Sequence, residues 1–81
     1  MDILVGKLYK NISCYTSEMI YADDEFDDWQ DSIDSVFQKE TVMVIEKSTK
    51  NRRVKVLTPR GLVGWCIICS DFWEQANSIG T

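Results

Sequence analysis

The chain has 81 residues and a mass of 9.4 kDa, which allows one small hydrophobic core and no second one. Its net charge of −4 disfavours nonspecific binding to a phosphate backbone, which requires lysine and arginine side chains. The chain has no histidine, so it lacks the commonest general base and the commonest zinc ligand. The sequence has no run of about 18 apolar residues, so no membrane span is expected, and no signal peptide is predicted at its start. We therefore expect a single domain over residues 1–81.

The charge is distributed unevenly along the sequence. Residues 1–36 carry nine acids and two bases, a balance of −7. Residues 37–81 carry seven bases and four acids, a balance of +3. This asymmetry predicts two oppositely charged faces, of which the acidic one is denser.

The first quarter of the chain predicts one strand followed by a loop. Side chains alternate between two faces after Gly6, so we expect a strand within residues 3–12. Residues 13–22 mix apolar and polar side chains without a clear period. This stretch is predicted to be a loop with a short extended piece.

Residues 24–37 show the spacing of a helix. Most positions of this segment are polar, chiefly aspartate, glutamine and serine, and an aspartate at 23 or 24 would cap the first turn. Because aspartate is a poor helix former, such a helix depends on burying its apolar side against another element. Five apolar side chains recur at the spacing of one helix face: Phe26, Trp29, Ile33, Val36 and Phe37. We predict a helix over residues 24–37.

The second half of the chain predicts short strands joined by polar turns. β-Branched residues and a two-residue period predict four strands, at residues 41–47, 52–58, 62–68 and 73–76. Residues 48–51 and 59–61 have the composition of turns, and residues 70–72 fit a single helical turn. The small polar residues 77–81 are expected to be disordered.

This succession of short strands, with a long acidic segment after the first strand, resembles the SH3-like barrel. Leu8-Tyr9 is similar to the opening strand of that family. The sequence Gly64-Trp65, followed by Ser70 to Glu74, resembles the last strands and the one-turn helix of this family, especially in its bacterial SH3-type domains. The resemblance implies a mostly-β fold, a five-stranded antiparallel barrel with one inserted helix in an enlarged RT loop at residues 13–38. Small SH3-like proteins of this general type also occur among bacteriophage proteins. This resemblance implies a phage source and a location in the host cytoplasm.

The sequence departs from the peptide-binding members of the SH3 family. Those domains hold polyproline ligands on a strip of aromatic side chains, and Tyr9 and Phe72 occupy matching positions here. Arg52 and Arg53 stand where a tryptophan is expected, and Cys69 replaces the proline before the helical turn. These departures argue against polyproline recognition.

Three cysteines, at positions 14, 66 and 69, form an odd set that favours a reducing, cytoplasmic compartment. Cys66 and Cys69 form a C-x-x-C sequence, but they interrupt an apolar run, and residues three apart on a strand face opposite sides. A zinc site would need two further ligands. We predict free thiols with a structural role, no zinc and no cofactor.

Two charged segments leave alternatives open. The acidic run at residues 23–28 is a solvated face, a calcium site without EF-hand spacing, or an imitation of the phosphates of nucleic acid. The basic strands at residues 47–60 would contact nucleic acid if Trp65 or Trp73 formed an exposed stacking platform.

Catalysis has no support in the sequence, since neither a nucleophile–base pair nor a phosphate-binding glycine-rich loop is present. We therefore expect a small non-enzymatic module that binds another protein, as a monomer or an oligomer, without a membrane. A nucleic-acid-associated barrel and an acidic nucleic-acid mimic are the alternatives.

The predicted helix suggests where a partner would bind. If its stripe packs on the barrel flank around Tyr9 and Phe72, the helix fills the position of the SH3 peptide groove. Its outer face would then dock a basic patch of the partner through four acids: Asp27, Asp28, Asp31 and Asp34. In the alternative, the helix completes the core and these acids only keep the protein in solution.

Overall fold

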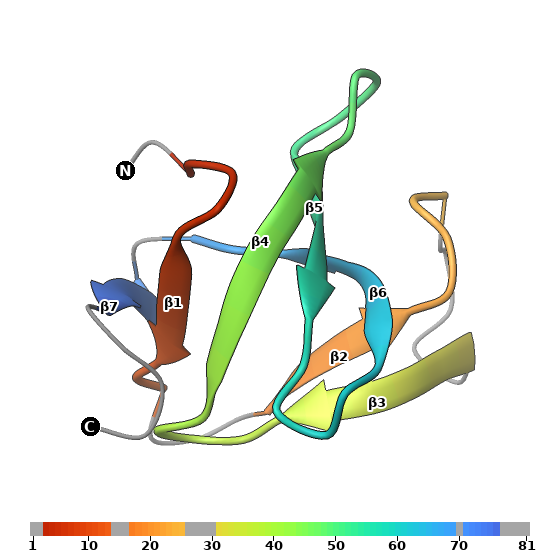
Figure 1. The fold of residues 1–81 in the computed structure, drawn as a ribbon. Helices are drawn as coiled ribbons and strands as arrows, with labels where there is room; N and C mark the ends of the chain where they lie inside the picture. The colour runs from red at the N-terminus through yellow and green to blue at the C-terminus, as the bar shows by residue number, and fades with distance from the viewer. Residues whose placement is uncertain (1–2, 14–16, 26–30, 70, 77–81) are drawn as a thin grey trace.

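A computed structural model of the chain describes residues 3–13, 17–25, 31–69 and 71–76. These residues form seven strands: β1 Leu8–Asn11, β2 Glu18–Tyr21, β3 Ser32–Val36, β4 Thr41–Lys47, β5 Arg53–Leu57, β6 Val63–Ile67 and β7 Trp73–Ala76. All pairings are antiparallel, in one sheet with the order β3-β2-β6-β5-β4-β1-β7 (Figure 1). The predicted mostly-β class is confirmed. The prediction of a five-stranded barrel is wrong, since β3 and β7 end an unclosed sheet of seven strands.

The predicted helix at residues 24–37 is also wrong within the described residues, which contain no helix. Ser32–Val36 is strand β3, paired antiparallel with β2 in a hairpin, and residues 26–30 lie outside the described part. The apolar positions do not share one buried face, because Val36 is buried while Ile33 and Phe37 are exposed. Serine and aspartate are weak helix formers, so the sheet partner decides the conformation of this segment.

Strands β4, β5, β6 and β7 match the predicted strands to within one residue at each end. The first strand is shorter than predicted, because the chain turns at Gly6 with φ 85°, and Gly6 N donates to Val44 O at 2.7 Å. The predicted turns at residues 48–51 and 59–61 are confirmed. Residues 77–81, predicted to be disordered, lie outside the described part.

The core fills the inside of the curled sheet. Val54 and Val56 point inward as their alternation predicted, and the neighbouring Lys55 lies on the outer face. Asn11 Nδ2 on β1 donates to Val36 O on β3 at 2.8 Å, although these strands are not neighbours in the sheet. The two halves of the sheet therefore approach each other across a common core: Tyr9, Ile20, Val36, Val42, Val44, Val54, Val56, Cys66, Ile68 and Trp73.

A glycine allows the β2–β3 hairpin to lie against β6. Tyr21 of β2 is paired with Trp65, and Gly64 beside it packs directly under the hairpin. A Cβ atom at position 64 would meet the Ile20 side chain and would lie 2.7 Å from Tyr21 O and 3.2 Å from Ile33 Cδ1. The contact with a backbone oxygen is too short for a side chain to relieve, so only glycine fits here.

We predict that Gly64→Ala lowers the free energy of unfolding by about 2–3 kcal/mol, as overpacking of a close contact does. Urea unfolding of the variant and the parent, followed by tryptophan fluorescence, measures the difference. Val63→Ala is the matched control, because Val63 is the preceding residue and its side chain is exposed. Equal stability of the Gly64→Ala variant and the parent would show that the hairpin does not pack on β6.

Candidate functional site

The structure separates the residues that the sequence suggested for partner binding. Tyr9 is fully buried, and its hydroxyl accepts a hydrogen bond from Leu4 N at 2.9 Å. Phe72 is exposed in the turn before β7. The predicted packing of a helix on the flank around these two rings is wrong, because the described part of residues 24–37 contains strand β3, paired with β2, and no helix.

The four suggested acids also differ in their surroundings. Asp31 is exposed just before β3, whereas the Asp34 side chain is mostly covered. Asp27 and Asp28 lie outside the described residues. Where the structure describes it, the acidic surface therefore offers Asp31 and no continuous row of carboxylates.

Acids of the first half of the chain are paired with bases of the second half. Lys50 Nζ lies 2.9 Å from Glu25 Oε1. Arg53 Nη1 donates to Asp24 O at 2.6 Å, and Ser48 Oγ donates to Asp24 Oδ2 at 3.0 Å. In the described residues, the ion pairs Lys50–Glu25 and Arg60–Asp34 therefore bring bases of the second half of the chain beside acids of the first half.

Arg60, in the turn between β5 and β6, holds the end of β3 in place. Its Nε lies 2.8 Å from Asp34 Oδ1, its Nη1 lies 2.8 Å from Glu40 Oε2, and its Nη2 donates to Ser35 O. The centre of the guanidinium lies 5.7 Å from the centroid of the Phe37 ring. We call these five residues the Arg60 clamp.

Both carboxylates of the Arg60 clamp are stabilised in their charged form. Burial alone would raise the pKa of Asp34, but hydrogen bonds from Ser35, Arg60 and Thr58 outweigh it and lower this pKa. The hydrogen bond from Arg60 is the main cause that lowers the pKa of Glu40, against a smaller effect of burial. The ion pairs of the clamp are therefore strongest at a pH above the ordinary pKa values of these two acids.

We predict that the Arg60 clamp makes stability depend on pH in the acid range. Carboxyls whose pKa is lower in the folded state stabilise it above their unfolded values, 3.8 and 4.5, and lose this contribution as pH falls through the folded values. Arg60→Met should therefore flatten the decline in unfolding free energy below pH 4.5, and should cost at most about 1 kcal/mol at pH 7.

Urea unfolding between pH 3 and pH 7 measures this difference. Lys50→Met is the control, because it removes an exposed pair with Glu25. If the unfolding free energies of the parent and the Arg60→Met variant changed in parallel with pH, the Arg60 clamp would not be the cause of the pH dependence.

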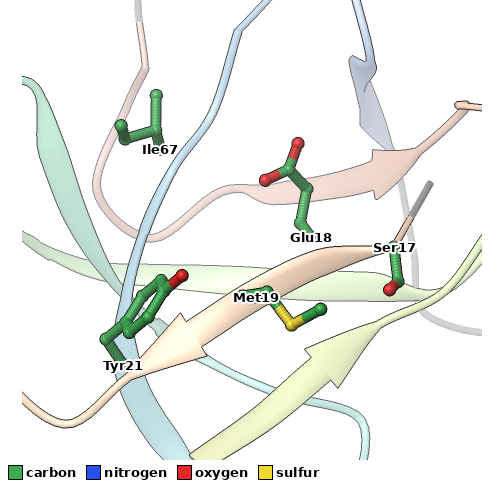
Figure 2. A pocket seen from close by; sticks show the side chains of 5 residues that line it. All are labelled: Ser17, Glu18, Met19, Tyr21 and Ile67. Atoms are coloured by element: carbon green, nitrogen blue, oxygen red, sulfur yellow. The ribbon is translucent and has the colours of Figure 1, made fainter. Parts of the chain in front are cut away.

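A pocket of about 170 Å³ opens where β2 meets the end of β6. In Figure 2 the Glu18 carboxylate rises from β2 toward the side where Ile67 lies, and the Tyr21 hydroxyl points to the same side. The pocket is lined by Ser17, Glu18, Met19, Tyr21 and Ile67. We call it the Glu18 pocket.

Glu18 carries a carboxylate that the fold does not compensate. It is half-buried, and this burial raises the pKa of its carboxyl. No base or hydrogen-bond donor of the described residues lowers that pKa. The nearby Cys66 thiol has its pKa raised to about 12 by burial and, to a smaller extent, by the charge of Glu18, so the thiol is neutral.

Sequence reasoning did not single out Glu18. Its one sequence signal is an acid directly before the apolar Met19-Ile20-Tyr21 run, which any surface acid beside a strand would give. The pocket arises only when β2 packs against β6, so its geometry requires the tertiary contact at Gly64.

We predict that Glu18→Gln stabilises the protein at neutral pH. Because the pKa of Glu18 is raised on folding, the parent loses stability as pH rises from 4.5 through the folded value, and the variant does not. Urea unfolding at pH 4 and pH 7 should show the two proteins equal at the lower pH and the variant more stable at the higher one. A variant that is less stable at pH 7 would mean that the carboxylate has a stabilising partner.

The cysteines and the metal-ligand types form no evident centre in the described residues. Cys66 is buried in β6 and Cys69 is half-buried after it, while Cys14 lies outside that part. Neither described thiol is in a disulfide. No three side chains of cysteine, aspartate or glutamate are grouped as metal ligands in residues 3–13, 17–25, 31–69 and 71–76.

In the part of the chain that the structure describes, no helix has the length and apolar composition to cross a membrane. Comparison with protein-family models, with curated proteins and with solved structures found no match. The function must therefore be inferred from the geometry of the chain itself.

Proposed function

We propose that this protein is a small SH3-like module that binds another protein and catalyses no reaction. The SH3-like assignment draws support from the chain order of the strands, since the excursion between β1 and β4 takes the place of the RT loop and β7 closes the series. The sheet does not close, and it contains an additional β2–β3 hairpin. Both features differ from the five-stranded barrel. The resemblance to small bacteriophage proteins supports, in addition, a phage source and action in the host cytoplasm.

The observation that carries the binding function is a group of exposed apolar side chains around the end of β3. We call it the β3 surface, and it consists of Ile33, Phe37 and Leu62, each more than 40% exposed. Figure 1 shows the turn between β5 and β6 lying next to the end of β3, which brings the two sources of this surface together. Grouped exposed apolar side chains of this kind mark interaction sites in soluble proteins.

Contacts within the protein hold the β3 surface in a fixed shape. The Phe37 ring, 55% exposed, lies under the Arg60 guanidinium, and Leu62 follows Arg60 by two residues. The Ile33 side chain packs over Gly64. An anchored aromatic ring loses little conformational entropy on binding, which favours it as a contact residue.

The charges beside the β3 surface favour a partner with basic residues. Asp31 is exposed next to Ile33, and Asp34 with Glu40 gives the Arg60 clamp a net charge of −1. A partner that places an apolar patch on Phe37 and a lysine or arginine near Asp31 would match both features.

Nucleic-acid binding by the basic strands has less support. Of the bases at residues 47–60, Lys50, Arg53 and Arg60 are occupied by acids or a carbonyl of the protein, and Lys55 lies 4.0 Å from Glu46. Trp65 is partly covered, with Lys55 Nζ 6.0 Å from its ring centroid. These contacts leave few free cations to replace the counterions of a phosphate backbone.

The tagged protein should retain a partner protein from a cell lysate whether or not nuclease is added, and mass spectrometry identifies that partner. With the purified partner, Phe37→Ser should weaken binding at least tenfold, since truncation of a hot-spot residue at the centre of an interface costs about 2 kcal/mol or more. Ile45→Ser is the control, because Ile45 is an exposed apolar residue on β4, outside the β3 surface.

Equal losses in the two variants would contradict the assignment to the β3 surface. Retention that disappears with nuclease and falls steeply with salt would favour the nucleic-acid alternative instead.

A further inference from the structure

One edge of the sheet is closed by side chains. In the described residues, β3 ends one side of the sheet, because its strand partner is β2 alone. An edge strand offers backbone N–H and C=O groups with which a strand of another chain can pair. We propose that the Arg60 clamp caps this edge, and that without the cap a second copy of this chain pairs with β3.

The first argument is that the backbone groups on the outer side of β3 already have partners. Ser35 N donates to Asp34 Oδ1 at 2.8 Å, and Ser35 O accepts from Arg60 Nη2. Phe37 N donates to Glu40 Oε1 at 2.8 Å, and Phe37 O accepts from Glu40 N at 3.0 Å. Ser35 and Phe37 are two residues apart, so their backbone groups point to the same side of the strand, and none of these bonds goes to β2. The clamp therefore occupies the positions at which a further strand would bond.

The second argument is that the turn between β5 and β6 has a defined shape, which directs Arg60 toward β3. Thr58 N donates to Leu62 O at 2.8 Å, and Leu62 N donates to the Thr58 hydroxyl at 3.1 Å. Gly61 N donates to Thr58 O at 3.0 Å, and Gly61 has φ 83°, a conformation that favours glycine. The cap is therefore supplied by a turn that its own hydrogen bonds hold in place.

The third argument is that β3 is complementary to a second β3. If two copies pair antiparallel about a two-fold axis at Ser35, Ile33 of one copy lies opposite Phe37 of the other. Both side chains are exposed, and a β-branched residue opposite an aromatic one stabilises an antiparallel pair. The same register places Asp34 opposite Val36, so no two carboxylates lie directly opposite each other. Because each copy contributes its one β3 edge, the assembly closes at a dimer.

The opposite edge of the sheet is less suited to pairing. Strand β7 has four residues, and Trp73 N at its start donates to Cys69 O at 3.0 Å. Glu74, the next residue, is exposed and lies 3.5 Å from Lys10 Nζ. Very short edge strands with charged side chains resist pairing with another chain. The dimer contact therefore belongs to β3.

The experiment measures the mass of the purified full chain by sedimentation equilibrium, at the micromolar to millimolar concentrations at which unpaired strand edges associate. The parent should keep the monomer mass of 9.4 kDa. Arg60→Met frees Ser35 O and releases the carboxylates of Asp34 and Glu40, so the mass should double as the concentration rises. Lys50→Met is the matched control and should stay monomeric, because it places the same side chain in the turn between β4 and β5 and removes an exposed ion pair there.

Two further measurements locate the contact. Ser35→Pro removes an N–H that points away from β2, so the hairpin does not need it but a second copy would. The double variant Arg60→Met/Ser35→Pro should return to the monomer mass, while its core amide chemical shifts show that the fold is kept. In a mixture of isotope-labelled and unlabelled Arg60→Met protein, nuclear Overhauser effects between copies should connect Ile33 with Phe37.

A second variant opens the cap at another point. Glu40→Ala frees Phe37 N and leaves Arg60 bound to Asp34, so it should also dimerise, at higher concentration than Arg60→Met. If neither variant dimerises although both are folded, the cap has no role in keeping the chain monomeric.

Three other outcomes would overturn the proposal. A dimer that persists with Ser35→Pro, or one without contacts between Ile33 and Phe37, would assign the association to another surface. Dimerisation of Lys50→Met would show that an added methionine is sufficient. A mass beyond twice that of the chain would exclude a closed pair of β3 edges. These samples contain no other protein, so their results are independent of the proposed partner binding at the β3 surface.

Discussion

The close approach of β2 to β6 at Gly64 is the constraint on which most of the structure depends. It adds the β2–β3 hairpin to the sheet that β4, β5 and β6 begin, and it brings Ile20 into the core. The same contact places Ile33 over Gly64, and it sets Glu18 near the end of β6. The core, the β3 surface and the Glu18 pocket therefore share one cause, a position where the backbones pack without a side chain between them.

Electrostatic contacts then hold the ends of the added hairpin. Asp24, at the end that follows β2, is bound by Arg53 and Ser48, and Asp34 near the other end is bound by Arg60. The Arg60–Asp34 contact is an ion pair, whereas Arg53 binds the backbone oxygen of Asp24 and the Ser48 hydroxyl binds its carboxylate. Among the acids that remain, Asp23, Asp31 and Asp71 are exposed, and Glu18 is half-buried without a cation among the described residues.

Some strands could be predicted from the sequence, whereas the β3 segment and the Glu18 pocket could not. Strand β5 was predictable because Val54 and Val56 alternate with Lys55, and strand β4 because it is rich in β-branched residues. The segment at residues 32–36 was not, because Ile33, Val36 and Phe37 also have helical spacing, and only the pairing with β2 decides between the two. The Glu18 pocket was not predictable, since its lining joins residue 67 to residues 17–21 through a tertiary contact.

The account rests on the hairpin and on its packing against β6, and nuclear Overhauser effects between backbone protons test both. We predict cross-strand contacts between Met19 and Ser35 within the hairpin, and between Tyr21 and Trp65 where β2 meets β6. Contacts between residues three apart along positions 31–37, together with the loss of the Tyr21–Trp65 contact, would show a helix there and would contradict the account.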